Sequence, residues 1–240
     1  RARGESGGGC GVSTEGLTRA GGSVGQAMDA YGFRPQWRGR VHLVAALVAL
    51  PATLFLVLAA RSTLARIAVG VFALSLIGTF AVSAAYHRLA RTPERVKWFR
   101  RADHSMIFIL IAGTYTPICL LALPAGWGIS MLVAVWVVAL AGATFKMVRL
   151  GADSDRSGSW LYIVLGWAAV IVTPQLISNL DGLQLLLMAA GGVIYTVGAI
   201  GLARRWPDPV PHRFGYHEVW HTMTVAAGGC HFALVALVLP

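Results

Sequence analysis

The chain has 240 residues, of which 56% are hydrophobic and only 12% are charged, against roughly 25% charged residues in a typical soluble domain. Its formal net charge is +10 and its mean hydropathy is +0.66, which leaves a membrane protein or a very apolar enzyme core. The three cysteines form no C-x-x-C pair, so a disulfide framework is excluded.

The first segment, residues 1–40, is rich in Gly, Ser and Arg. It contains no apolar core of about 7–15 residues ahead of a small-residue cleavage site, so it does not resemble a signal peptide. We expect a disordered cytoplasmic tail over residues 1–40 and a single membrane domain over residues 41–240.

Seven apolar segments of the length needed to cross a bilayer follow the tail. Only helices and closed barrels satisfy their own backbone polar groups in lipid. We therefore predict an all-α fold, a seven-transmembrane helix bundle. The predicted spans are residues 42–60, 65–87, 103–123, 127–148, 160–178, 183–203 and 216–239.

The basic residues alternate between the two sides of this predicted bundle. Of the 20 Lys and Arg residues, all except Arg61 and Arg66 fall in the tail or in the links after the second, fourth and sixth spans. Positive charge marks the cytoplasmic side, so we expect the N-terminus inside, the C-terminus outside and a multi-pass protein of the cell membrane. Membrane lipids are the expected partners and nucleic acid is not, while protein partners stay unknown.

Several polar or ionisable side chains fall at the cytoplasmic ends of the predicted spans, where burying them in lipid would be costly. Ser83 and His87 end the second span, Asp103 begins the third, and His217 and His221 begin the seventh. Three histidine nitrogens with a fourth position left open are typical of a catalytic zinc site. The topology therefore predicts zinc ligands at His87, His217 and His221.

Three further histidines are expected to serve other roles. His42 and His104 are near span ends, and we interpret His42 as an interfacial residue and His104 as a headgroup-region residue. His231 is ten residues after His221, about 15 Å along a continuous helix. We therefore expect His231 to form an interhelical hydrogen bond rather than bind metal.

The segment HEVWH, residues 217–221, matches the H-E-x-x-H pattern of zinc peptidases. Such enzymes need a further ligand, and no Asp or Glu follows His221. The sequence LDG, residues 180–182, resembles a third-ligand motif of intramembrane proteases, but the topology places it on the outer side. The peptidase interpretation is therefore disfavoured.

Three stretches together resemble the hemolysin III family, the bacterial branch of the progestin and adipoQ receptor group: SAAYHRL, ADHSMIFILIAGTYTP and HEVWHTMTVAAGGCHF. The resemblance implies a protein of the bacterial inner or plasma membrane, with a cytoplasmic-side Zn²⁺ site on His87, His217 and His221. It also implies that Ser83 and Asp103 hold or activate the zinc-bound water. In that family the residue at position 218 varies, so Glu218 need not be the base. RPQWRGRVH stands where an acidic Glu-x-x-Asn-type stretch is expected.

These observations predict a zinc-dependent hydrolase of lipid amides or esters at the cytoplasmic leaflet, with a role in membrane homeostasis. Asp103 would act as general base, and Ser83 would hydrogen-bond the water or the developing oxyanion. The Ser, Asp and His pattern also resembles that of the alkaline ceramidases, which favours an amide. A non-catalytic zinc-containing receptor or membrane-state sensor is the main alternative, and a cytolytic pore is a lesser one.

Overall fold

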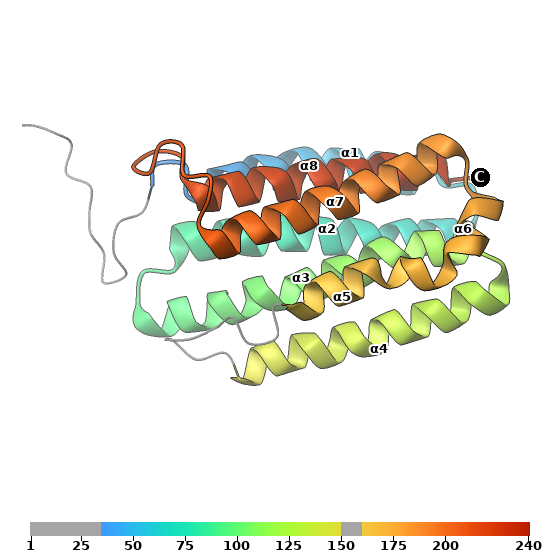
Figure 1. Cartoon of the computed structure of the whole chain (residues 1–240), viewed down its shortest axis with the longest axis horizontal. Helices are drawn as coiled ribbons and strands as arrows, with labels where there is room; N and C mark the ends of the chain where they lie inside the picture. The colour runs from blue at the N-terminus through green and yellow to red at the C-terminus, as the bar shows by residue number, and fades with distance from the viewer. Residues whose placement is uncertain (1–34, 150–159) are drawn as a thin grey trace, which may run out of the picture.

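The computed structural model describes residues 35–149 and 160–240. Within these residues the fold is helical, with one isolated β-bridge between Val210 and Phe214. The helices run along a common long axis (Figure 1). They are α1 (Arg40–Ala59), α2 (Thr63–Leu89), α3 (Pro93–Leu121), α4 (Ala125–Arg149), α5 (Trp160–Gly166), the 3₁₀ helix η2 (Trp167–Val172), α6 (Thr173–Asn179), α7 (Gly182–Arg204) and α8 (Tyr216–Leu237).

Six helical segments are long and apolar enough to cross a membrane. They are α1 to α4, the run Trp160–Asn179 and α7. The remaining long helix, α8, is not among them; it carries three histidines and Glu218 in its 22 residues. The all-α class is confirmed, while the crossing of the membrane by α8 stays a prediction.

The start of α3 differs from the prediction. This helix begins at Pro93, about ten residues before the expected start of the third span. The Thr92 side chain accepts a hydrogen bond from the Arg95 backbone N–H, Pro93 occupies the first turn and Glu94 supplies an acidic residue there. These are ordinary helix-start signals. The extra turns carry many basic residues, so hydropathy alone does not detect them.

The fifth predicted span is interrupted rather than continuous. The Tyr115 hydroxyl donates to the Gly166 carbonyl (2.9 Å) and accepts from the Ala169 backbone N–H (2.7 Å). Pro174, which lacks a backbone N–H, lies in the first turn of α6. A side chain inserted into the helical hydrogen-bond ladder and a nearby proline both break α-helical geometry, which accounts for the 3₁₀ segment η2.

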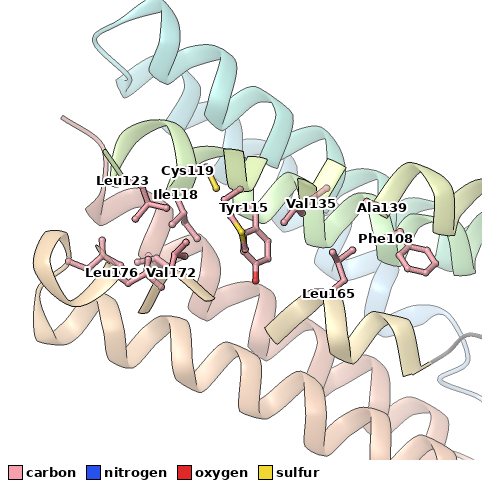
Figure 2. Packing of buried hydrophobic residues seen from close by; sticks show 14 of the residues in the cluster. Phe108, Tyr115, Ile118, Cys119, Leu123, Val135, Ala139, Leu165, Val172 and Leu176 are labelled. Carbon is pink, nitrogen blue, oxygen red and sulfur yellow. The ribbon is translucent and has the colours of Figure 1, made fainter. Parts of the chain in front are cut away.

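Two hydrophobic clusters hold the bundle together. One fills the space between α3, α4 and the α5–α6 run, from Phe108 at one end to Leu176 at the other (Figure 2). The other joins α1, α2 and the C-terminal half of α8. Burial of large apolar side chains such as Phe72 and Phe108 fixes the order of the helices.

The starts of α1, α3 and α8 and the ends of α2 and α7 meet at one end of the bundle, here called the histidine end, on the left in Figure 1. The predicted tail lies outside the described residues as far as residue 34. Residues 35–39 form a turn that pairs with the α7–α8 link, where the Trp37 N–H donates to the Arg213 carbonyl (3.1 Å). Gly39 adopts a left-handed conformation (φ 75°) directly beside His87.

Candidate metal centre

Three histidine side chains converge at the histidine end. His87 comes from the last turn of α2, and His217 and His221 lie one turn apart on α8. One ligand nitrogen from each lies within 4.8 Å of the others. The Nε2 atoms of His87 and His217 are 3.1 Å apart. His87 and His221 are buried, and His217 is partly buried.

The donor set fits a zinc ion. Two nitrogens at about 2.0–2.1 Å from a tetrahedral ion lie roughly 3.3 Å from each other, close to the separation of the His87 and His217 nitrogens. Nδ1 of His221 is buried without a hydrogen-bond partner among the described residues. A buried ring nitrogen with no partner is unusual, and metal binding at this cluster would explain it. Three histidines can therefore hold a metal ion here.

Ser83 and Asp103 form a polar pair near the three histidines. Ser83 lies one helical turn before His87 on α2, is 2% exposed, and lines the same cavity as Asp103 of α3. Asp103 is not one of the three converging residues in the part of the chain that the structure describes. Ser83 and Asp103 therefore lie beside the centre, and their catalytic roles stay a prediction.

The glutamate of the H-E-x-x-H segment is engaged elsewhere. Glu218 is fully buried, and its Oε1 accepts a hydrogen bond from the Nε of Arg38 (2.6 Å). Its Oε2 accepts from the Gly215 backbone N–H (3.0 Å), which caps the start of α8. Both carboxylate oxygens of Glu218 are therefore engaged by a cation or a backbone N–H, and the prediction that Glu218 need not be the base stays a prediction.

The other histidines occupy distinct environments. His42 is only 3% exposed and stacks on His221, with ring centroids 3.9 Å apart. Its predicted interfacial role is therefore wrong, because α1 packs against α8 and encloses the ring. His104 contacts the Arg100 carbonyl through Nδ1 (2.9 Å). The ring of His231 lies 5.8 Å from that of Tyr195 on α7, and its interhelical hydrogen bond stays a prediction.

A cavity of about 840 Å³ adjoins the centre. His217 and His221 line it together with Ser83 and Asp103. From there it continues between α3, the α5–α6 run and α7, where its walls are mainly apolar side chains such as Ile111, Leu176 and Met188. The space beside the histidines therefore suits a molecule with a polar end and a long apolar part.

Two contributors to this region were not predicted from the sequence. Arg38 approaches Glu218 across 180 positions of the chain, and His42 reaches the histidine cluster from α1. The only sequence signal was their shared segment, RPQWRGRVH, which replaces the expected acidic stretch. A fully buried Glu218 requires a nearby cation, but the pattern did not indicate which of the many arginines supplies it.

Comparison with known proteins identifies the family. The profile of the family described as "Haemolysin-III related" matches residues 32–232. Hemolysin-3 of Bacillus cereus is 32% identical over 205 residues, which cover 83% of this chain and 89% of that protein. The Hemolysin-3 homolog of Bacillus subtilis (strain 168) is 31% identical over 198 residues, with 81% and 89% coverage. With six apolar spans, this is a multi-pass integral membrane protein of the bacterial cell membrane, and the chain belongs to the haemolysin III family.

Proposed function

We propose that the protein is a zinc-dependent hydrolase of lipid amides or esters, active at the cytoplasmic leaflet and involved in membrane homeostasis. The observation that carries the proposal is the shared cavity. Its wall contains two of the three converging histidines and the Ser83–Asp103 pair, and its remaining length is mainly apolar. A lipid chain can occupy the apolar part while its amide or ester group lies beside the polar end.

The proposed topology adds α8 as the seventh span, with the N-terminus cytoplasmic. The basic residues support this orientation, because among the Lys and Arg of residues 35–149 and 160–240 only Arg61 and Arg66 fall on the side away from the histidine end. Asp103 and the histidines then lie at the level of the inner leaflet. Lipids of that leaflet are the proposed partners and the proposed substrates.

Each residue of the site would have a separate role in hydrolysis. His87, His217 and His221 would hold the zinc ion, which polarises a carbonyl and lowers the pKa of water when bound. Asp103 would accept a proton from the attacking water and pass it to the leaving group. Ser83, which lines the cavity together with Asp103, would hydrogen-bond the water or the developing oxyanion. The apolar walls would exclude bulk water from the reacting end.

The test compares zinc content and lipid-amide turnover in purified protein. We expect His87→Ala to lose zinc, and Asp103→Asn to keep zinc while turnover falls by at least about 100-fold. Asp181→Asn is a matched control, since Asp181 caps α7 and Asn caps helices equally well. Unchanged zinc in His87→Ala would show that the ligand assignment is wrong.

Lipidomics of cells with and without the protein identifies the substrate, with Asp103→Asn as the inactive reference. We expect an amide- or ester-linked lipid to accumulate in the absence of the protein and in the presence of Asp103→Asn. A zinc-loaded wild-type protein that changes no lipid would instead favour the receptor or sensor. The names of the Bacillus relatives suggest cytolysis, for which release of dye from vesicles is the corresponding measurement.

A further inference from the structure

Tyr195 of α7 and His231 of α8 lie side by side in the wall of the cavity, away from the metal centre. Their ring centroids are 5.8 Å apart and the ring planes are tilted by 31°. The other α7 side chains in this wall are mainly small or apolar, such as Met188 and Ala199. The Tyr195–His231 pair therefore places hydrogen-bonding groups in a mainly apolar part of the cavity, and the proposed hydrolysis does not use them.

The Tyr195 hydroxyl differs from the other tyrosine and threonine hydroxyls that line the cavity in the described residues. Those of Tyr115 and Tyr162 donate to the backbone carbonyls of other helices. The threonine hydroxyls also donate to backbone carbonyls: Thr79, Thr114, Thr173, Thr196 and Thr224. The Tyr195 hydroxyl makes no hydrogen bond within residues 35–149 and 160–240. A tyrosine hydroxyl in an apolar interior usually has a partner, so its lack of one needs an explanation.

The Tyr195 hydroxyl is accessible from inside the bundle. In the part of the chain that the structure describes, the side-chain nitrogen and oxygen atoms that are both sealed and unpaired belong to His42 and His221. The unpaired hydroxyl of Tyr195 is not among them, so a molecule of the size of water can reach it. A Cβ added at Gly228 of α8 would lie 3.8 Å from this hydroxyl and 3.5 Å from the Phe80 side chain. The hydroxyl therefore faces α8 and α2, and the cavity is the space from which it can be reached.

The depth of the pair sets which part of a lipid would meet it. Helix α8 is continuous from Tyr216 to Leu237, and Gly228 and His231 follow His221 by seven and ten residues. At 1.5 Å per residue, the pair lies about 10–15 Å from His221 along the helix axis. An extended alkyl chain advances roughly 1.25 Å per carbon, given a C–C bond of about 1.5 Å. A chain whose carbonyl lies at the histidines therefore brings about its eighth to twelfth carbon to the pair.

The chemistry of the pair fits a hydroxyl group. A tyrosine hydroxyl donates and accepts, and a neutral imidazole offers one donor and one acceptor. The predicted interhelical hydrogen bond of His231 would occupy one ring nitrogen and leave the other. We infer that Tyr195 and His231 form a binding site for a hydroxyl group near the middle of an acyl chain held in this cavity. The position along the chain rests on the proposed function, whereas binding of the hydroxyl requires no turnover.

The test compares fatty acids, which contain no amide or ester bond for the protein to hydrolyse. The dissociation constants of 10-hydroxystearic, 18-hydroxystearic and stearic acid are measured by displacement of a fluorescent fatty acid from the zinc-loaded protein in detergent micelles. We expect 10-hydroxystearic acid to bind about 3- to 10-fold more tightly than stearic acid, as for one additional hydrogen bond. The 18-hydroxy isomer should show no such gain, because its hydroxyl extends past the pair.

Tyr195→Phe removes the hydroxyl and keeps the ring. We expect Tyr195→Phe and His231→Leu each to bring the affinities for 10-hydroxystearic and stearic acid within about twofold of each other. Thr114→Val is the matched control, since Thr114 also lines the cavity but its hydroxyl already donates to the Leu110 carbonyl (2.8 Å). Thr114→Val should keep the preference of the wild type for the 10-hydroxy acid.

Melting temperature distinguishes this role from a structural one. Tyr195→Phe breaks no hydrogen bond among the described residues, so it should melt within about 2 °C of the wild type. A larger fall would show that the hydroxyl stabilises the bundle instead. Equal affinities of the wild type for 10-hydroxystearic and stearic acid, or a preference that survives in Tyr195→Phe, would also overturn the inference. A wild type that shows the preference but hydrolyses no lipid would refute the proposed function alone.

Discussion

The buried ion pair between Arg38 and Glu218 allows a quantitative prediction. Arg38→Met removes the cation and leaves the fully buried Glu218 carboxylate with the hydrogen bond from the Gly215 backbone N–H but no cation. Losing one partner of a buried pair costs about 3–5 kcal/mol. Glu218→Gln should cost less, because the Arg38 side chain is 21% exposed and can be rehydrated. Arg38→Met should therefore have a lower free energy of unfolding than Glu218→Gln.

The double variant Arg38→Met/Glu218→Gln tests whether the two side chains act as a pair. We expect it to be destabilised by less than the sum of the single variants, because neither charge is then left buried alone. The assay is thermal unfolding of purified protein in detergent. For a chain of this size, 1 kcal/mol corresponds to roughly 2–4 °C, so Arg38→Met should melt about 6–20 °C lower than the wild type.

Turnover and zinc content decide between a structural and a chemical role for Glu218. We expect Glu218→Gln to retain zinc and lipid-amide turnover at a temperature where it is folded. A Glu218→Gln protein with normal zinc and normal melting temperature but no turnover would refute the structural interpretation. It would restore Glu218 as the base of an H-E-x-x-H site. Additive effects of the two substitutions would refute the pairing.

Three further predictions concern the surroundings of the centre. Gly39→Ala should lower the melting temperature and zinc occupancy together, since the added Cβ would lie 2.8 Å from the His87 Cβ at a left-handed φ; a change in neither would contradict this. Tyr115→Phe should cost about 1–3 kcal/mol in thermal unfolding, because the Ala169 N–H loses its partner; an unchanged melting temperature would contradict that. Chelation should lower the melting temperature of the wild type but not of His87→Ala, since a metal that binds only the folded state stabilises it; equal shifts would argue against the site.

Helix ends show how far local signals extend. Hydropathy predicted all six helical segments that are long and apolar enough to cross a membrane. It placed the start of the third span at residue 103, whereas α3 begins at Pro93. The signals for the true start, Thr92, Pro93 and Glu94, were present in the sequence. Hydropathy does not detect these signals, because the charged part of a helix that extends beyond the bilayer contains few apolar residues. The break at η2 had no such local signal, since it depends on Tyr115 of another helix.

Composition and the order of charges along the chain were sufficient to predict an all-α membrane bundle and to place His87, His217 and His221 at one end. The bundle and the placement of the histidines both depend on which segments partition into lipid and on where each segment begins. Local sequence encodes both of these properties. The Arg38–Glu218 pair and the stacking of His42 on His221 were decided only by the tertiary structure. Which side chains meet across two packed helices depends on the rotation of each helix about its axis, and that rotation is set by the packing of the whole bundle.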